Sequence, residues 1–245
     1  MKNWTKFEKT LLTANIILTA IAVIIGKTYG WLDVLGALSA LTNVVCVILC
    51  ARRSITNYYW GIPAVLSYGI LSLIYGNLGE AGLNLTYYLF MQFYGIKQWN
   101  KNLESKNIVI SKKMTRKQAI TTYSLLVLCT VVFGVILMSA STPIQGLFYG
   151  SAAKGFGYDK FLIDSATTVF SVFAMYLMAK CYLEQWLIWI IIDVFTVILW
   201  TVYTPNTFMA IQWIVFTANA CYGYYEWKSN ETLHRRIENA RQILP

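Results

Sequence analysis

The chain has 245 residues, long enough for one or two soluble domains, but its composition excludes an ordinary soluble protein. Hydrophobic residues make up 57% and charged residues only 13%, against about 25% charged in a typical globular domain. The net charge of +9 does not indicate nucleic-acid binding, because the basic residues lie in short clusters between apolar segments. We therefore expect an all-α integral membrane protein whose partners are membrane lipids and a small molecule, with no nucleic acid.

Eight apolar segments follow one another along the chain, and most approach the roughly 20 residues that a helix needs to cross a bilayer. Lipid offers no partner for backbone polar groups, so each segment is predicted to be helical. The segments lie at residues 11–26, 31–51, 58–75, 80–99, 119–139, 161–179, 186–203 and 207–226.

The first segment follows Lys2, Lys6 and Lys9 and so resembles the start of a secretory signal peptide. The residues after it, GKTYGW, contain no Ala-x-Ala cleavage site. We interpret the segment as a retained N-terminal helix.

Basic residues are distributed unevenly between the two ends of the predicted helices. With the N-terminus in the cytoplasm, 17 of the 20 Lys and Arg residues fall on the cytoplasmic side. This bias follows the positive-inside rule and predicts eight spans with both termini in the cytoplasm.

Two short motifs indicate an internal repeat. YGIKQW (94–99) and YGYYEW (222–227) share the pattern Tyr-Gly-x-x-x-Trp, and each ends an apolar segment. We call the separation from Tyr94 to Tyr222 the repeat offset. Aligning the motifs predicts two parallel three-helix bundles, with one lone helix between them to restore the direction of the chain.

The repeat divides the chain into five predicted units. They are an N-terminal tail and extra helix (1–30), a first bundle (31–99), a basic linker with the lone helix (100–160), a second bundle (161–227) and a cytoplasmic tail (228–245).

The motif residues also carry local expectations. Trp99 and Trp227 are predicted to anchor the cytoplasmic ends of equivalent helices at the membrane interface. Gly95 and Gly223 are predicted to allow close approach of a neighbouring helix.

Four longer motifs make the chain similar to a known family: NYYWG (57–61), NLTYYLFMQFYGIKQW (84–99), EQWLIWIIID (184–193) and NACYGYYEW (219–227). Together with the helix plan, they resemble the PnuC family of nicotinamide riboside transporters, and the plan is also similar to that of SWEET-type sugar transporters. The resemblance implies facilitated uptake without ATP hydrolysis, in the bacterial cytoplasmic (inner) membrane. It also implies a homotrimer, and a cytoplasmic kinase that traps the riboside as a phosphate.

The sharpest candidate site lies in the seventh segment. Trp186, Trp189 and Asp193 recur at helical spacing and share one face. Two indole rings beside a carboxylate suit a flat, cationic aromatic ring such as the pyridinium of nicotinamide riboside. The alternatives are an interfacial position for the two Trp residues and a structural role for Asp193.

Polar and aromatic residues of other segments complete the predicted substrate-binding set. Carboxamides donate and accept hydrogen bonds, so they suit both a ribose hydroxyl and an amide of the substrate. The alternative for any single one is a hydrogen bond between helices. The set contains Asn84, Tyr88 and Gln92 in the fourth segment, Gln212, Asn219 and Tyr222 in the eighth, and Trp60 in NYYWG.

The sequence lacks the motifs that would indicate a metal site, a redox pair or a nucleotide-binding site. The five cysteines form no Cys-x-x-Cys, and the only histidine, His234, lies in the polar tail. There is no Walker A or dinucleotide-binding glycine motif. We therefore expect no cofactor, no metal and no catalytic residue. A uniporter is the first hypothesis; a proton-coupled carrier of another vitamin or small polar solute, using Asp193, and a membrane-embedded enzyme remain as alternatives.

Overall fold

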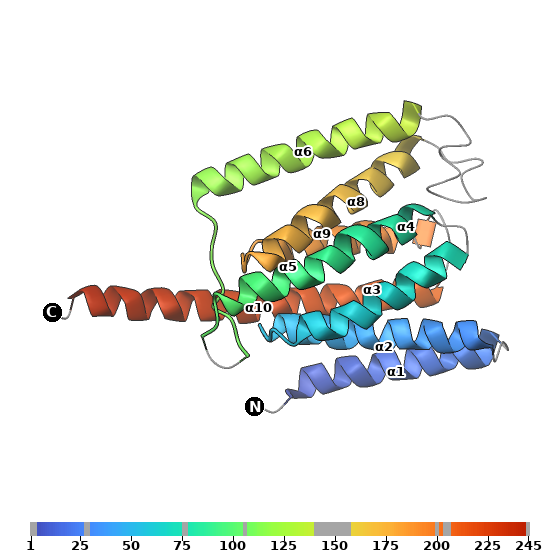
Figure 1. Cartoon of the computed structure of the whole chain (residues 1–245), viewed down its shortest axis with the longest axis horizontal. Coiled ribbons are helices and arrows are strands. Elements are labelled where there is room, and N and C mark those ends of the chain that lie inside the picture. The colour runs from blue at the N-terminus through green and yellow to red at the C-terminus, as the bar shows by residue number, and fades with distance from the viewer. Residues whose placement is uncertain are drawn as a thin grey trace.

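A computed structural model describes residues 4–26, 30–74, 78–104, 107–139, 158–198, 201–202 and 207–243. Within these ranges the regular structure is helical, with only three isolated β-bridges (Figure 1). The predicted all-helical fold is therefore confirmed.

The N-terminal part of the chain forms one helix and then three helical runs. The third run contains a π-helical turn, η1, between two α-helices. These elements are α1 (Lys6–Gly26), α2 (Trp31–Ala51), α3 (Asn57–Ile74), and the run of α4 (Leu78–Gly82), η1 (Leu83–Tyr88) and α5 (Leu89–Asn100).

The C-terminal part contains a single helix and a second set of three. They are α6 (Arg116–Ser139), α8 (Tyr158–Ala179), α9 (Gln185–Ile198) and α10 (Thr207–Ile243). Most bounds lie within a few residues of the predicted segments. The main difference is α10, which continues as one helix through the residues predicted as a tail and projects beyond the other helices (Figure 1).

Hydrophobic side chains face outward over much of the surface. Helices α2 and α6 both combine sufficient length with a mean hydropathy of 2.3, enough to cross a membrane. On α6, Val127, Leu128, Val131 and Ile136 are each at least half exposed. Such a surface is unfavourable in water and suits lipid contact.

The repeat seen in the motifs extends to the backbone. Arg53 and Cys181 are separated by the repeat offset, follow equivalent helices, and are the described non-glycine residues with positive φ, at 60° and 63°. The residue after each donates the same backbone hydrogen bond, Ser54 N to Leu49 O and Tyr182 N to Leu177 O, both at 2.9 Å. Left-handed non-glycine residues are uncommon, so their match at this offset is strong support for duplicated bundles.

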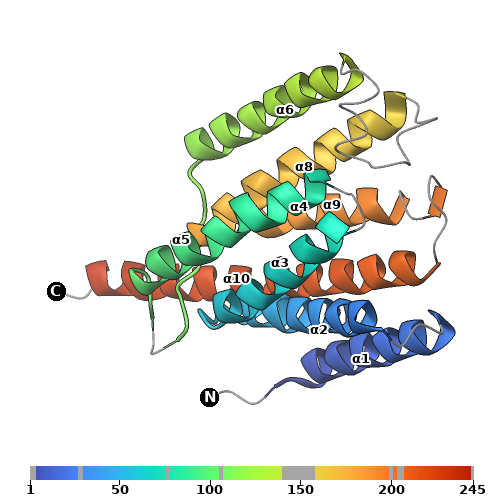
Figure 2. The same cartoon turned by 45° about the vertical axis from the view of Figure 1, so that its right-hand side comes forward.

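The two bundles contact each other reciprocally. Helix α5 of the first packs on α8 of the second, and α10 of the second packs on α2 of the first (Figures 1 and 2). These pairs are equivalent under the repeat offset. Helix α6 packs on α8, whereas α1 contacts both α2 and α10. The interface between the halves therefore has pseudo-two-fold character.

The linker after α5 crosses one end of the bundles and bonds to both repeated turns. Val109 N donates to Arg53 O at 3.0 Å, and Lys112 N donates to Cys181 O at 2.8 Å. Ser111 Oγ donates to Trp227 O at 2.7 Å. The linker therefore ties the two halves together at this end, which we call the linker end.

Candidate functional site

Asp193 is a buried carboxylate in α9. Its side chain is 4% exposed, and no salt bridge reaches it from the described residues. A charge removed from water without a partner is unfavourable and is usually retained for function. Asp193 therefore places an acidic side chain inside the molecule without a charged partner among the described residues.

The face of α9 that carries Asp193 points inward. Trp186 and Thr196 on this face are buried and Trp189 is half-buried, whereas Leu187 and Val194 on the other side are exposed. Trp186, at 3% exposure, is not an interfacial residue, so this alternative is excluded for it.

Three predicted carboxamides are buried, one in α10, which packs on α9, and two in the run of η1 and α5. Asn219 Nδ2 in α10 donates to Val47 O of α2 at 3.3 Å, across the interface of the two halves. Gln92 Nε2 donates to Tyr88 O at 3.2 Å, and Asn84 Nδ2 donates to Glu80 O at 2.9 Å.

Two of these carboxamides keep an acceptor free of described partners. The oxygens Asn219 Oδ1 and Gln92 Oε1 are buried without a hydrogen-bond partner among the described residues. Buried acceptors are normally satisfied, so these two atoms are available to another partner.

Asn84 and Tyr88 are positioned by the π-helical turn η1, which contains both. Such turns rotate the side chains out of the ordinary helical register and are frequent at functional sites. Tyr88 packs against the same buried cluster as Trp189, and Trp186 is a member of that cluster. Residues from α5, η1 and α9 thus converge in one region.

Trp60 and Gln212 are not brought into this region by described contacts, and Tyr222, which packs against the same cluster, is bonded to α1. Trp60 lies on the outer surface with 45% exposure. The Tyr222 hydroxyl donates to Glu8 Oε1 of α1 at 3.1 Å, and its ring packs on Phe7. The side chain of Gln212 lies outside the described part of the structure.

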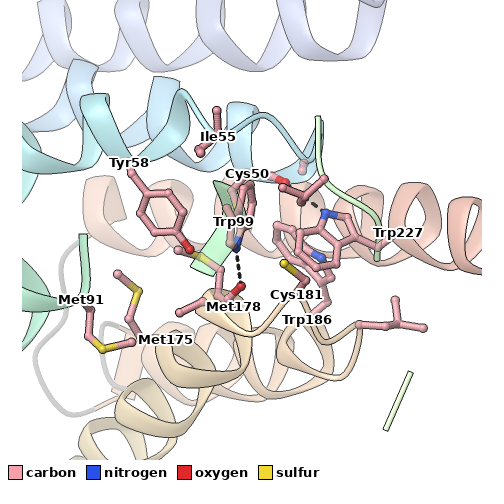
Figure 3. Close-up of a cluster of buried hydrophobic side chains, with 14 of the residues drawn as sticks. Cys50, Ile55, Tyr58, Met91, Trp99, Met175, Met178, Cys181, Trp186 and Trp227 are labelled. Atoms are coloured by element: carbon pink, nitrogen blue, oxygen red, sulfur yellow. Dashed lines mark hydrogen bonds between the residues drawn. The ribbon is translucent and has the colours of Figure 1, made fainter. Parts of the chain in front are cut away.

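At the linker end, four aromatic rings close the interface between the halves. Tyr58 packs edge-on against Trp99, and Trp186 packs edge-on against Trp227. The ring centroids of Trp99 and Trp227 lie 5.8 Å apart. We call Tyr58, Trp99, Trp186 and Trp227 the aromatic plug (Figure 3).

The hydrogen bonds of the aromatic plug are reciprocal. Trp99 Nε1 donates to Met178 O of the second bundle at 2.8 Å, and Trp227 Nε1 donates to Cys50 O of the first at 3.0 Å (Figure 3). Both Trp side chains have 0% exposure. The predicted interfacial anchoring of Trp99 and Trp227 is therefore wrong: each crosses to the opposite half to satisfy a carbonyl there.

The predicted close approach at the motif glycines is confirmed. A Cβ at Gly223 would lie 2.6 Å from the Trp186 ring, and a Cβ at Gly95 would overlap the Tyr58 ring. Tyr58 and Trp186 are separated by the repeat offset, as are their glycines. The Tyr-Gly-x-x-x-Trp motif therefore specifies one glycine-on-ring contact and one crossing hydrogen bond in each half.

Sequence reasoning missed two buried carboxamides beside the aromatic plug. Asn57 and Gln185 each have 0% exposure and begin the equivalent helices α3 and α9. They too are separated by the repeat offset, which is visible in the sequence because NYYWG and QWLIW start at these positions. At the start of an apolar segment, each resembled an ordinary loop residue.

Two reciprocal helical bundles, an outward apolar surface and polar groups buried between helices define a helical membrane transport protein as the class. A family model described as "Nicotinamide mononucleotide transporter" matches residues 30–229, so the chain belongs to that family of membrane transporters. It is accordingly a membrane protein and not an enzyme.

Curated relatives carry the name "Nicotinamide riboside transporter PnuC". The protein from Neisseria mucosa is 28% identical over 230 residues, covering 91% of this chain and 81% of the relative. The protein from Haemophilus influenzae is also 28% identical over 230 residues, covering 93% and 92%. A solved structure described as "Crystal structure of the Vitamin B3 transporter PnuC" aligns with 96% of this chain and 95% of its own, with a TM-score of 0.73 and 24% identity. The fold is therefore shared.

Proposed function

We propose that the protein mediates facilitated uptake (uniport) of nicotinamide riboside across the bacterial cytoplasmic membrane, as a precursor of NAD. The observation that carries the proposal is the buried carboxylate of Asp193 on the same inward face as Trp186 and Trp189. A cationic pyridinium ring matches this site in charge and in shape. The names of the curated relatives support the same substrate.

The riboside fits the interior better than the mononucleotide named in the family description. A mononucleotide carries a phosphate, which proteins bind with Arg, Lys or clustered backbone N–H groups. The buried charged and polar side chains of the described residues include no Lys or Arg. Asp193 would also repel a phosphate. We therefore favour the riboside, whose ribose carries an uncharged hydroxyl group, over the mononucleotide, whose ribose carries a phosphate ester.

In this proposal the substrate lies between α9, α10 and the run of α4, η1 and α5. Asp193 faces the pyridinium charge, and Trp186 and Trp189 bound the aromatic ring. Asn219 and Gln92 offer their oxygens to the substrate carboxamide or the ribose.

The other predicted residues have lesser roles in the proposal. Asn84 and Tyr88 line the side formed by η1. Gln212 of α10 stays a predicted contact, since its side chain lies outside the described part of the structure. Trp60 and Tyr222 stay outside the proposed contacts, because one is exposed and the other bonds to α1.

We further propose eight spans with both termini in the cytoplasm, so that the linker end is cytoplasmic. The linker end carries Arg52, Arg53, Lys112 and Lys180, in agreement with the positive-inside rule. Cysteine labelling of single-Cys variants at the linker and at the far end tests this orientation. If only the linker cysteines were labelled from outside the cell, the orientation would be the opposite of the one proposed.

Two partners follow from the family resemblance and belong to the proposal. A homotrimer is expected in the membrane, and a cytoplasmic riboside kinase is expected to trap the substrate after release. Light scattering of the purified protein in detergent measures the oligomeric state, and a monomeric mass would contradict the first expectation.

A proton-coupled carrier of another vitamin or small polar solute is the second candidate, because a buried carboxylate such as Asp193 is able to carry a proton. No second buried carboxylate is described near Asp193 on α9 or α10 to form a relay. We therefore retain uniport as the proposed mechanism.

Proteoliposomes test the proposal directly. Vesicles containing the protein, a riboside kinase and ATP are supplied with labelled nicotinamide riboside. Uniport predicts accumulation as the phosphate, equilibration without accumulation when ATP is omitted, and no effect of an imposed pH gradient. Uptake equal to that of protein-free vesicles would refute transport of this substrate, and accumulation driven by the pH gradient alone would support the second candidate.

A further inference from the structure

The aromatic plug lies between the proposed substrate site and the linker end. Trp186 belongs to the plug, and Asp193 follows it by seven residues, roughly 10 Å along α9. The plug joins the two halves through two crossing hydrogen bonds. A substrate that moves from the Asp193 region along α9 toward the linker end therefore meets Trp186 and the plug to which it belongs.

Gln185 lies beside the plug in an unfavourable environment. Its side chain has 0% exposure, and neither Oε1 nor Nε2 has a hydrogen-bond partner among the described residues. Trp186 Nε1, on the next residue, is also buried and unpartnered in the described structure. Leaving buried polar atoms unpaired has the full cost of desolvation, and both donor and acceptor groups are affected here.

The equivalent residue of the first bundle shares this property only in part. Asn57 is equally buried and its Oδ1 also has no described partner, but its Nδ2 donates to Ser54 O at 2.7 Å and so closes the turn before α3. Local structure thus accounts for the donor group of Asn57. No described contact accounts for the Gln185 amide, although the backbone turn before it is the same.

We propose that Gln185 is a second substrate contact, at the exit through the aromatic plug, that hydrogen-bonds the carboxamide of the departing substrate. The inference rests on the proposed function. A primary carboxamide donates and accepts, and the Gln185 amide offers the complementary donor and acceptor. Trp186 Nε1 supplies a further donor. Gln185 makes this contact while the substrate passes and the rings of the aromatic plug are apart. The contact therefore lowers the free-energy barrier to substrate release and leaves the free energy of the bound state unchanged.

The test compares binding with transport for Gln185→Met, a substitution of similar size that removes the amide. We expect equilibrium binding of nicotinamide riboside to stay within about twofold of wild type, because Asp193 and its neighbours are unchanged. The uptake rate in kinase-loaded proteoliposomes should fall about fivefold, the factor that one ordinary hydrogen bond provides. Thermal stability should be equal or higher, because an unpaired buried amide is removed.

A substrate analogue and a matched variant separate a role in passage from a structural one. The 3-acetylpyridine riboside keeps the acceptor but lacks the N–H donor, so its transport should be slower than that of the riboside in wild type and about equal to it in Gln185→Met. Asn57→Leu should lower thermal stability through loss of the bond to Ser54 and leave the ratio of the two substrates unchanged.

Three outcomes would overturn the inference. Wild-type uptake by Gln185→Met would show that the amide makes no contact in passage. Parallel loss of stability, binding and rate would assign Gln185 a structural role. If the ratio of the transport rates of the two ribosides were the same in Gln185→Met as in wild type, Gln185 would not bind the substrate carboxamide. Absence of both binding and uptake in the wild-type protein would instead refute the proposed function, and the inference with it.

Discussion

Asp193 and the glycines of the repeated motif show how single residues determine the site and the packing beneath it. Asp193 is a buried acidic side chain that no described salt bridge reaches. Gly95 and Gly223 provide the space in which Tyr58 and Trp186 lie against α5 and α10. Each of these roles leads to a substitution with a defined outcome.

Asp193→Asn removes the charge and keeps the size of the side chain. We expect the affinity for cationic nicotinamide riboside to fall at least about tenfold, as for loss of a buried opposite charge. The uncharged dihydronicotinamide riboside should bind the variant and the wild type about equally. Calorimetric titration of both ligands measures the difference. An equal loss for the charged and uncharged ligands would show that Asp193 does not recognise the cation.

Gly223→Ala places a methyl group against the Trp186 ring, 2.6 Å from its nearest atoms. Overpacking of this kind costs about 1–3 kcal/mol, so a lower melting temperature is expected. Gly36→Ala in α2 is the matched control, because no atom lies within 4 Å of its added Cβ. The control should be neutral or stabilising by up to about 1 kcal/mol, as for Gly-to-Ala changes in helices. Equal melting temperatures for both variants would contradict the packing described.

At the scale of elements, α1 and the linker connect the two bundles at the linker end. Glu8 of α1 is 2% exposed; it accepts from Arg52 Nη1 at 2.9 Å, at the end of α2, and from the Tyr222 hydroxyl at 3.1 Å, in α10. The extra N-terminal helix is therefore attached to both halves, not to the first bundle alone.

Tyr222→Phe and Glu8→Ala test this attachment. Loss of one hydroxyl hydrogen bond should lower stability by about 1 kcal/mol, whereas removal of the buried carboxylate breaks its bonds to Thr5 N, Arg52 and Tyr222 together and should cost about 3 kcal/mol or more. Melting curves in detergent measure both. Substrate affinity should stay unchanged in Tyr222→Phe. A large loss of affinity would show that Tyr222 contacts the substrate.

The linker is also held by Glu104, which accepts from Arg53 Nη1 at 3.1 Å and lies 3.0 Å from His234 Nε2 of α10. Burial raises the pKa of Glu104, but the hydrogen bonds and charges of Arg53 and His234 outweigh burial, so its pKa lies below the ordinary value. A lowered pKa in the folded state stabilises the fold above the ordinary pKa, and this contribution is lost as the pH falls through the lowered pKa.

We therefore expect the melting temperature to decrease on acidification below about pH 4.5, and Glu104→Gln to flatten that decrease. The contribution is under about 1 kcal/mol, because the carboxylate is one-third exposed and screened by water. Melting curves from pH 7 to pH 3 measure it. A Glu104→Gln variant with the same pH dependence as wild type would show that this ion pair does not stabilise the linker.

At the scale of the whole molecule, hydrophobicity and the repeat predict much of the fold, because both are properties of contiguous sequence. The bounds of α2 agree with its predicted segment to the residue, and the repeat offset recurs in the turns at Arg53 and Cys181. The prediction that Trp99 and Trp227 lie at the membrane interface is wrong because a Trp at the end of an apolar segment has the same local sequence whether it faces lipid or a second bundle. Their partners, Met178 and Cys50, are 79 and 177 residues away.

The candidate site was predictable to the extent that it lies on single helices. The face of α9 with Trp186, Trp189 and Asp193 follows from helical spacing and is inward in the structure. The bond of Tyr222 to Glu8, 214 residues away, depends on how an extra helix docks and has no local signal. Gln185 gave no signal because the linker bonds to the residues just before it, with Leu183 N donating to Lys112 O at 2.8 Å, and such a contact between distant segments has no local pattern.

A binding titration of the purified wild-type protein tests the central claim most directly, with nicotinamide riboside, nicotinamide mononucleotide, nicotinamide and thiamine compared under the same conditions. The buried Asp193 and the absence of Lys and Arg among the described buried residues predict tight binding of the riboside, with the mononucleotide weaker by at least about 100-fold, a difference of about 2.7 kcal/mol. Equal or tighter binding of the mononucleotide, or no binding of the riboside, would contradict the account.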